Sequence, residues 1–264
     1  MAHLLIFGLG YTAKRIANSV REAGWSVDAT GSDGNVDFGD REAVLATLNT
    51  ATHILSSVPP DRTAQNDPVL ESYGEALRGR ALFYLSSTGV YGDQQGAWVD
   101  ESTPTVVETG AGRRNARAEA DAAWLAKDAR VFRLPGIYGP GRSALDRVRD
   151  GRARRIDLPG QVFSRVHVDD ITSGVVSALT QYAPSGAYNL GDDLPASGNA
   201  VTEHACALLG LEPPPMETLE QANLSEMARG FYAENRRVAN GKAKRVLGWE
   251  PDYPTYFEGL SALL

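Results

Sequence analysis

The stretch HLLIF-GLGYTA, which runs from His3 to Ala13, decides the fold of this chain. The five residues before Gly8 predict a buried strand, and Ala13, Ile16, Ala17 and Val20 recur at the spacing of one helix face. Two glycines and a small third residue between a strand and a helix allow a tight bend, close approach of a pyrophosphate and close packing. The helix start then offers unpaired N–H groups to the phosphates. The stretch therefore predicts a dinucleotide site, with a plain strand-to-helix turn as the alternative.

Strand and helix patterns alternate through the first half of the chain. We expect further strands at 27–30, 53–58, 81–87 and 130–134, and helices at 41–48, 68–78 and 113–127. Strands separated by helix-length segments pair in parallel through right-handed crossovers. The sequence thus predicts an α/β fold, a Rossmann-type doubly wound parallel sheet whose ligand lies at the carboxyl ends of the strands.

The pattern becomes less regular after Gly136. A strand at 162–168, a helix at 169–179 and a short strand at 188–191 are expected, followed by two further helices that end at 247–251. We interpret residues 1–138 as the Rossmann domain, with returns to it from about 163–191. Residues 139–264 form a smaller, interleaved C-terminal lobe that binds substrate.

Composition limits the function classes. The chain has 264 residues, a net charge of -7 and a pI near 5.2, which argues against a nucleic-acid surface. A single cysteine, Cys206, and four scattered histidines predict neither a disulfide nor a metal site. The apolar start is too short for a signal peptide or a membrane span, so we expect a cytoplasmic protein without a membrane partner. The oligomeric state is left open, with a homodimer as one alternative.

Six blocks together resemble the extended short-chain dehydrogenase/reductases, in their epimerase/dehydratase branch. These blocks are GLGYTA at 8–13, LSSTGVYGD at 85–93, RLPGIYGPG at 133–141, VHVDDI at 166–171, YNLGD at 188–192 and LGW at 247–249. They span nearly the whole chain in the order of the family. The resemblance implies the Rossmann fold, NAD or NADP as cofactor, and an oxidoreductase or epimerase/dehydratase-like activity on a small polar substrate.

The chain departs from this family at the catalytic residues. The family uses a Tyr-x-x-x-Lys pair and a Ser or Thr, and no Tyr-x-x-x-Lys occurs in this sequence. Ser87 matches the Ser/Thr position. The arginines at 113–117 stand where the pair is expected, with Arg113 and Arg117 in its two places or as part of a solvated helix start. Arginine stays protonated far above pH 7, so Arg113 cannot exchange a proton, although Arg117 could hold a ribose hydroxyl. The chain therefore resembles atypical members of the superfamily.

The resemblance also implies the candidate site residues. The catalytic candidates are Ser87, Tyr91 and Arg113, although the loop position of Tyr91 favours a packed residue over a catalytic one. The cofactor candidates are Gly8, Gly10, Tyr11, Thr12, Ala13, Gly31, Ser32, Asp37, Phe38, Ser57, Val58, Pro59, Ser86, Arg117 and Pro135. Gly31 stands where an acidic residue would select NAD, and no arginine beside it selects NADP, so the choice stays open.

The substrate and the presence of catalysis are also open. Five arginines between Arg147 and Arg155 lie in the expected substrate lobe, where they could bind an anionic substrate or form a solvated basic surface. Gly136 replaces the asparagine that contacts substrate in nucleotide-sugar epimerases. Arg165 precedes His167 by two positions rather than four. The alternative to an enzyme is a catalytically silent NAD(P)-binding sensor or scaffold.

Overall fold

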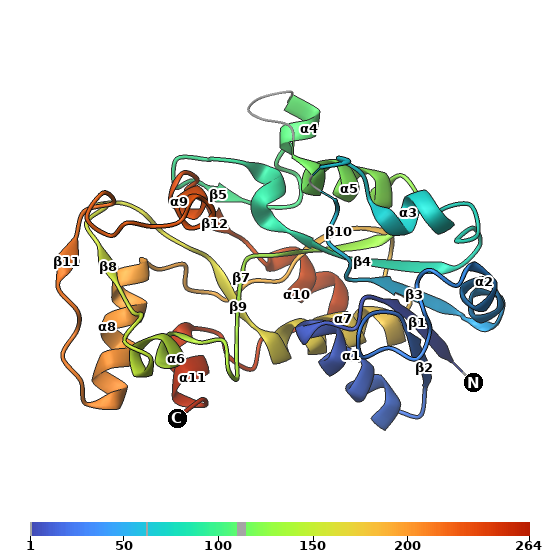
Figure 1. The fold of residues 1–264 in the computed structure, drawn as a ribbon, viewed down its shortest axis with the longest axis horizontal. Helices are drawn as coiled ribbons and strands as arrows, with labels where there is room; N and C mark the ends of the chain where they lie inside the picture. The colour runs from blue at the N-terminus through green and yellow to red at the C-terminus, as the bar shows by residue number, and fades with distance from the viewer. Residues whose placement is uncertain (1, 62, 110–114) are drawn as a thin grey trace.

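A six-stranded parallel sheet forms the centre of the molecule (Figure 1). The computed structural model describes residues 2–61, 63–109 and 115–264. The strand order is β10-β6-β4-β3-β1-β2. The bounds are β1 His3–Phe7, β2 Ser26–Ala29, β3 His53–Ser56, β4 Ala81–Ser87, β6 Arg130–Leu134 and β10 Gly186–Asn189. The order reverses between β1 and β3, which makes this point the topological switch of the sheet.

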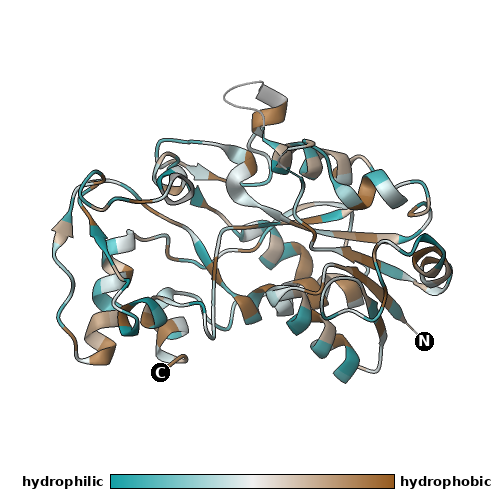
Figure 2. Ribbon diagram, in the orientation of Figure 1, coloured by the Kyte–Doolittle hydropathy of each residue, from teal (hydrophilic) through white to brown (hydrophobic). Residues whose placement is uncertain are grey.

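Helices cover both faces of the sheet because successive residues of each strand point to opposite sides. Leu4 and Ile6 of β1 join one buried cluster, whereas Leu5 and Phe7 join another. One face packs against α1 (Tyr11–Glu22), α7 (Val168–Thr180) and α10 (Gly241–Leu247), and the other against α2 (Arg41–Thr50), α3 (Pro68–Tyr73) and α5 (Ala116–Leu125). Figure 2 shows apolar colour along the strands and polar colour on outer helix surfaces. The doubly wound fold predicted from the sequence is confirmed.

A smaller group of elements lies at the C-terminal end of the molecule (Figure 1). Its apolar cluster includes Leu145, Val201, Ala205 and Leu260. The elements are α6 Ala144–Arg149, α8 Gly198–Leu209, α9 Glu226–Tyr232, α11 Tyr256–Ser261, β8 Arg155–Ile156 and β11 Met216–Glu217. A two-stranded parallel pair connects this group to the main sheet; its strands are β7 Gly136–Tyr138 and β9 Arg165–His167. The remaining elements are the 3-10 helix η1 Thr88–Tyr91, β5 Trp98–Val99, α4 Val106–Thr109 and β12 Arg237–Val238.

Several element bounds differ from the sequence expectations. The strand expected at 162–168 spans only Arg165–His167, and the helix expected to reach residue 78 ends at Tyr73 before Gly74. A glycine is a poor helix residue, which favours the end at that point. The N-cap of α7 is His167, whose Nδ1 accepts from the Asp169 N–H at 3.3 Å. The side chain of a histidine therefore caps this helix, which begins one residue before the expected start at 169.

The helix expected at 113–127 begins later in the described structure. Helix α5 starts at Ala116 behind Asn115, which has an extended backbone and accepts a hydrogen bond from the Ala118 N–H at 2.7 Å. This side-chain cap satisfies one of the unpaired N–H groups at the helix start. Asn115 therefore caps α5, while the arginines at 113–114 of the expected helix lie outside the described residues.

Candidate functional site

The turn between β1 and α1 leaves open space at the helix start. Gly8 has a φ of +85°, and an added Cβ there would lie 3.1 Å from the Val58 side chain. Gly10 is the N-cap of α1, has no side-chain cap and would find no atom within 4 Å of an added Cβ. The first turn of α1 also contains no acidic side chain. An anionic group therefore has both room and unpaired N–H donors at this position.

Three loops that are distant in the sequence meet at the switch point between β1 and β3. The Gly8 N–H donates to the Thr30 Oγ1 at 3.1 Å, and the Ser57 hydroxyl donates to the Gly8 carbonyl. A Cβ on Gly31, whose φ is +109°, would lie 3.1 Å from the Leu9 nitrogen. The structure thus brings together three segments that contain cofactor candidates, those at 8–13, 31–32 and 57–58.

The loop after β2 places the remaining adenine-side candidates. Asp37 accepts from the Gly39 N–H at 2.9 Å, and Phe38 packs edge-on against Phe7 at 6.1 Å between ring centroids. Lys14 of α1 forms an ion pair with Asp33, two residues after Gly31. Ser32 and Pro59 are exposed at the same edge. The cation nearest to the position that distinguishes NAD from NADP is therefore already paired with a carboxylate.

Tyr91 belongs to a buried polar network. Its hydroxyl donates to the Asn189 Oδ1 at 2.9 Å and accepts from Arg133 at 3.1 Å. Arg133 also forms a 2.7 Å ion pair with Asp121, and the Ser86 hydroxyl donates to the same carboxylate at 2.7 Å. Burial raises the pKa of Tyr91, an effect that Arg133 partly offsets. This placement favours the packed-loop alternative for Tyr91, and it directs the Ser86 side chain into the network.

Arg117 is held by the sheet rather than by the open crevice. Its guanidinium donates to the Tyr84 hydroxyl at 2.9 Å and to the Leu85 carbonyl at 3.5 Å. The Tyr84 ring stacks on Trp124 of the same helix, with ring centroids 5.3 Å apart. The contact of Arg117 with a cofactor ribose stays a prediction. Arg113, the other arginine candidate, lies outside the described residues.

A cavity of about 1040 Å³ opens beyond the carboxyl ends of β4 and β6. Ser87 and Pro135 line it, so both of these candidates lie at its edge. The Ser87 hydroxyl accepts from the Gly89 N–H at 3.1 Å, which caps η1. The wall is mainly apolar and aromatic, and it includes Ile137, Tyr138, Val162, Phe163, Val201, Phe231, Tyr232, Tyr256 and Leu260. A large, mostly apolar cavity with a few polar groups is typical of a small-molecule site.

Part of the cavity wall comes from a segment that the sequence analysis did not single out. Arg236 donates to the Gly92 carbonyl at 2.7 Å, and the following strand β12 pairs in parallel with β5. Tyr232 of α9 also lines the cavity. The pairing of β12 with β5 brings these residues to the cavity, and no local sequence motif indicates that pairing.

Tyr138 of the cavity wall has its hydroxyl against α11. Its hydroxyl lies where a Cβ on Gly259 of α11 would stand, and it has no hydrogen-bond partner among the described residues. Burial raises the pKa of this hydroxyl, and the nearby Asp192 raises it further. The contact explains why α11 has a glycine at this position.

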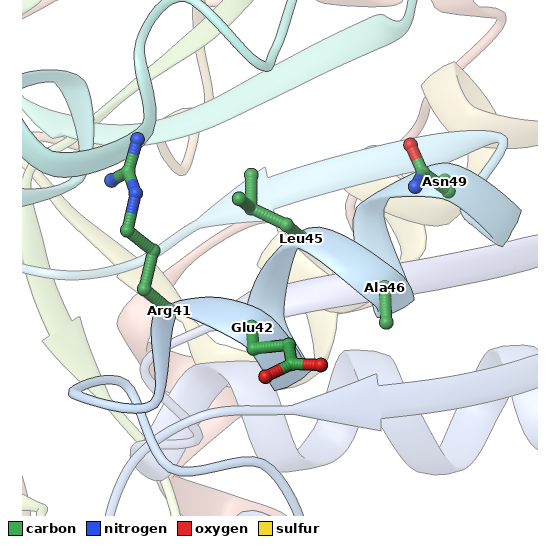
Figure 3. Close-up of a pocket in the computed structure, with 5 residues that line it drawn as sticks. All are labelled: Arg41, Glu42, Leu45, Ala46 and Asn49. Carbon is green, nitrogen blue, oxygen red and sulfur yellow. The ribbon is translucent and has the colours of Figure 1, made fainter.

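A second depression lies on the outer side of α2 (Figure 3). Arg41, Glu42, Leu45, Ala46 and Asn49 line it, and all five come from the same helix. It is shallow and lacks polar groups that converge from other elements. The cavity at the carboxyl edge of the sheet is therefore the stronger candidate site.

Comparisons with known proteins agree with this geometry, although no family model matches the chain. A protein of unknown function from Silicibacter pomeroyi is 38% identical, with a TM-score of 0.86 and coverage of 100% of this chain and 98% of the other. This chain and that protein belong to one family. A dTDP-glucose 4,6-dehydratase from Bacillus anthracis in complex with NAD has a TM-score of 0.78 at 17% identity, covering 100% and 95% of the two chains.

A human epimerase family protein with NADPH has the same TM-score, 0.78, at 16% identity over 99% and 98% of the two chains. The chain has the extended short-chain dehydrogenase/reductase fold. Among curated proteins, a Streptomyces 3-diazoavenalumate denitrifying reductase is 28% identical over 98% of this chain and 95% of its own length. Protein YeeZ of Escherichia coli K12 is 29% identical over 96% and 97%.

Within residues 2–61, 63–109 and 115–264, no helix is long and apolar enough to cross a membrane. The same residues contain no group of three or more His, Cys, Asp or Glu side chains placed to hold a metal ion.

Proposed function

We propose that this chain is an NAD(P)-dependent oxidoreductase, or an epimerase/dehydratase-like enzyme, that acts on a small polar substrate in the cavity beyond β4 and β6. The observation that carries the proposal is the open start of α1 at the switch point, on the same edge of the parallel sheet as the cavity. The NAD and NADPH complexes of proteins with this fold, and the relative named as a reductase, support it.

The residues at the β1–α1 turn fit a dinucleotide. The backbone N–H groups of Tyr11, Thr12 and Ala13 would receive the pyrophosphate, because Gly10 leaves the space in front of them free. Gly31 adds no side chain and no carboxylate beside them. Asp33 could hold the ribose and Lys14 could meet a 2′-phosphate, but these two side chains neutralise each other. The proposal therefore includes both NAD and NADP.

Ser87 is the side chain that would orient the reacting substrate oxygen. It stands at the end of β4 on the cavity edge, where its hydroxyl can donate a hydrogen bond while it still accepts one from the Gly89 N–H. A bound nicotinamide supplies the hydride donor or acceptor. Because arginine cannot release a proton near pH 7, the proton carrier would be a cavity hydroxyl or water rather than Arg117.

A catalytically silent NAD(P)-binding sensor is the second candidate function. It is favoured by the absence of Tyr-x-x-x-Lys from the sequence and by the burial of the Tyr91 hydroxyl between Arg133 and Asn189. A sensor would change its structure on binding the cofactor and would turn over no substrate. A screen of carbonyl substrates with NADPH and NADH, read by the absorbance of the reduced cofactor, detects an oxidoreductase. Chromatography of the products detects an epimerase or dehydratase, which leaves the cofactor unchanged over a turnover, and a sensor gives neither signal.

The cofactor part of the proposal is tested by titrating the protein with NADH and NADPH and following cofactor fluorescence. Wild-type protein should saturate with at least one of them. Gly10→Val should abolish this response, because the new side chain fills the space where the pyrophosphate would lie. The same variant should melt near the wild-type temperature, since no protein atom opposes an added Cβ. A wild-type response to neither cofactor, or an unchanged affinity in Gly10→Val, would refute the proposal.

A further inference from the structure

The charges that line the cavity are not balanced within it. Five arginines reach the wall, and three have an acidic partner: Arg152 pairs with Asp150, Arg154 with Glu217 at 2.9 Å, and Arg236 with Glu234 at 2.5 Å. The other two, Arg147 and Arg165, make no ion pair with a carboxylate among the residues that the structure describes. The cavity therefore holds two positive charges that no carboxylate neutralises through an ion pair.

Arg147 is the one of the two that a ligand can reach. It lies on α6 and is exposed, and its guanidinium makes no hydrogen bond to another described residue. Desolvation by the surrounding protein lowers the pKa of Arg147; Tyr232 and the neighbouring Asp146 raise it in part, and Arg152 lowers it. The group nevertheless stays charged, since arginine is protonated throughout the physiological range. A charge that is partly desolvated and has no partner binds an anion more strongly than a charge in bulk water does.

Arg165 adds positive potential from inside the wall. Its side chain is 9% exposed and lies over the Tyr256 ring, with 5.5 Å between the guanidinium carbon and the ring centroid. One terminal nitrogen donates to the Ala196 carbonyl at 3.1 Å, while the other is buried without a partner. The nearest opposing carboxyl, that of Asp192, has its pKa raised to about 8 by burial, although Arg165 lowers it. Its charge therefore offsets Arg165 only in part at neutral pH.

The apolar part of the cavity wall determines which uncharged portion of a ligand can pack there. Aromatic and aliphatic side chains, among them Phe163, Val201 and Leu260, cover much of the surface around the two arginines. A diphosphate would need several free cations or backbone donors, whereas three of the five arginines are already neutralised by their own partners. The combination of one reachable cation and an apolar wall fits a single carboxylate on an apolar or aromatic body.

We propose that the cavity takes a small amphipathic carboxylate as substrate, with the carboxylate on Arg147 in the field of Arg165 and the apolar body against Phe163 and Val201. This inference rests on the proposed function, because it names the substrate class for the same cavity. It sets the substrate apart from the nucleotide sugar in the Bacillus anthracis dehydratase's name.

The test uses calorimetric titration of the full chain, saturated with whichever reduced cofactor it binds. The probes are 3-phenylpropanoate, its neutral amide 3-phenylpropanamide, and UDP-glucose. The carboxylate should bind about ten-fold or more tightly than the amide, which is the scale of one charge-assisted hydrogen bond. Arg147→Gln should weaken carboxylate binding by about the same factor and leave the amide unchanged. Arg147→Lys, which keeps the charge, should restore part of the loss.

Arg149→Gln is the matched control, because Arg149 lies on the same helix, is exposed and is absent from the cavity wall. It should leave binding of all three probes unchanged. Equal affinities for carboxylate and amide, equal effects of the Arg147 and Arg149 variants, tighter binding of UDP-glucose, or no carboxylate binding at millimolar concentration would each overturn the inference. Cofactor titration of the same samples is independent of these outcomes, so failure of the proposed function would be seen separately as loss of cofactor binding.

Discussion

The dehydrogenase/reductase pattern has characteristic residues at the turn after β1 and at the start of α5, and this chain has them only at the turn. At the turn, Gly8, Gly10 and Ala13 are present, and the space that a pyrophosphate needs is open. At the start of α5 there is no tyrosine and lysine pair, and Arg117 is bound to Tyr84 of the sheet. Backbone geometry at the turn is thus separable from the side-chain chemistry at α5, since neither depends on contacts with the other.

The largest effect should come from the buried ion pair that anchors α5. Asp121→Ala removes the partner of Arg133 and leaves a buried, uncompensated guanidinium, which typically costs about 3–5 kcal/mol. Urea denaturation measures this loss of unfolding free energy. Ser86→Ala, the control, removes one hydrogen bond to Asp121 but keeps the ion pair, and should cost only about 1–3 kcal/mol. If the two variants were equally stable, α5 would not be anchored through this pair.

An intermediate effect is expected at the adjacent serines on β4. Ser87→Ala should lower turnover of a substrate found by screening by about ten-fold, because it removes the donor on the cavity edge, while cofactor affinity changes little. Steady-state kinetics and cofactor titration measure the two quantities. Ser86→Ala should leave turnover unchanged, since its hydroxyl points to Asp121. Equal turnover in wild type and Ser87→Ala would remove Ser87 from the catalytic candidates.

The smallest effect concerns Arg117. Its described contacts indicate that Arg117→Ala and Tyr84→Phe each lose the same hydrogen bond, worth about 1 kcal/mol of unfolding free energy. Dinucleotide affinity should then change by less than about three-fold in both variants. Paired fluorescence titrations of the two variants provide the measurement. A loss of about ten-fold in Arg117→Ala alone would instead support the ribose contact that the sequence predicts.

The sequence predicted best where the structure follows from local pattern. The strands His3–Phe7, Ala81–Ser87 and Arg130–Leu134 were predicted with the observed bounds, because their apolar runs are enclosed by turn residues. The meeting of the loops at Gly8 and Ser57 also followed from the predicted parallel sheet, since parallel strands place their carboxyl ends on one edge.

The sequence predicted poorly where contacts join distant segments. Nothing local shows that the Tyr91 hydroxyl meets Asn189, which is 98 residues away, or that Arg133 and Asp121 are buried together. The sequence does not distinguish Arg147 from Arg149, because both belong to one basic run. Only the packing of α6 against α8 determines that Arg147 lines the cavity and Arg149 does not. Side-chain direction on a short helix depends on its neighbours, so periodicity alone could not separate the two.

The pairing of β12 with β5 has a consequence for synthesis of the protein on the ribosome. Residues 94–96 are synthesised long before Asn235, whose carbonyl accepts the Gln94 and Gly96 N–H groups at 3.0 and 2.9 Å. The nascent chain can therefore bring together the loops at Gly8, Gly31 and Ser57 long before the wall around Arg236 emerges. A ribosome stalled before residue 235 would therefore display the crevice together with a substrate cavity that lacks the wall formed by Arg236, Val238, Tyr256 and Leu260.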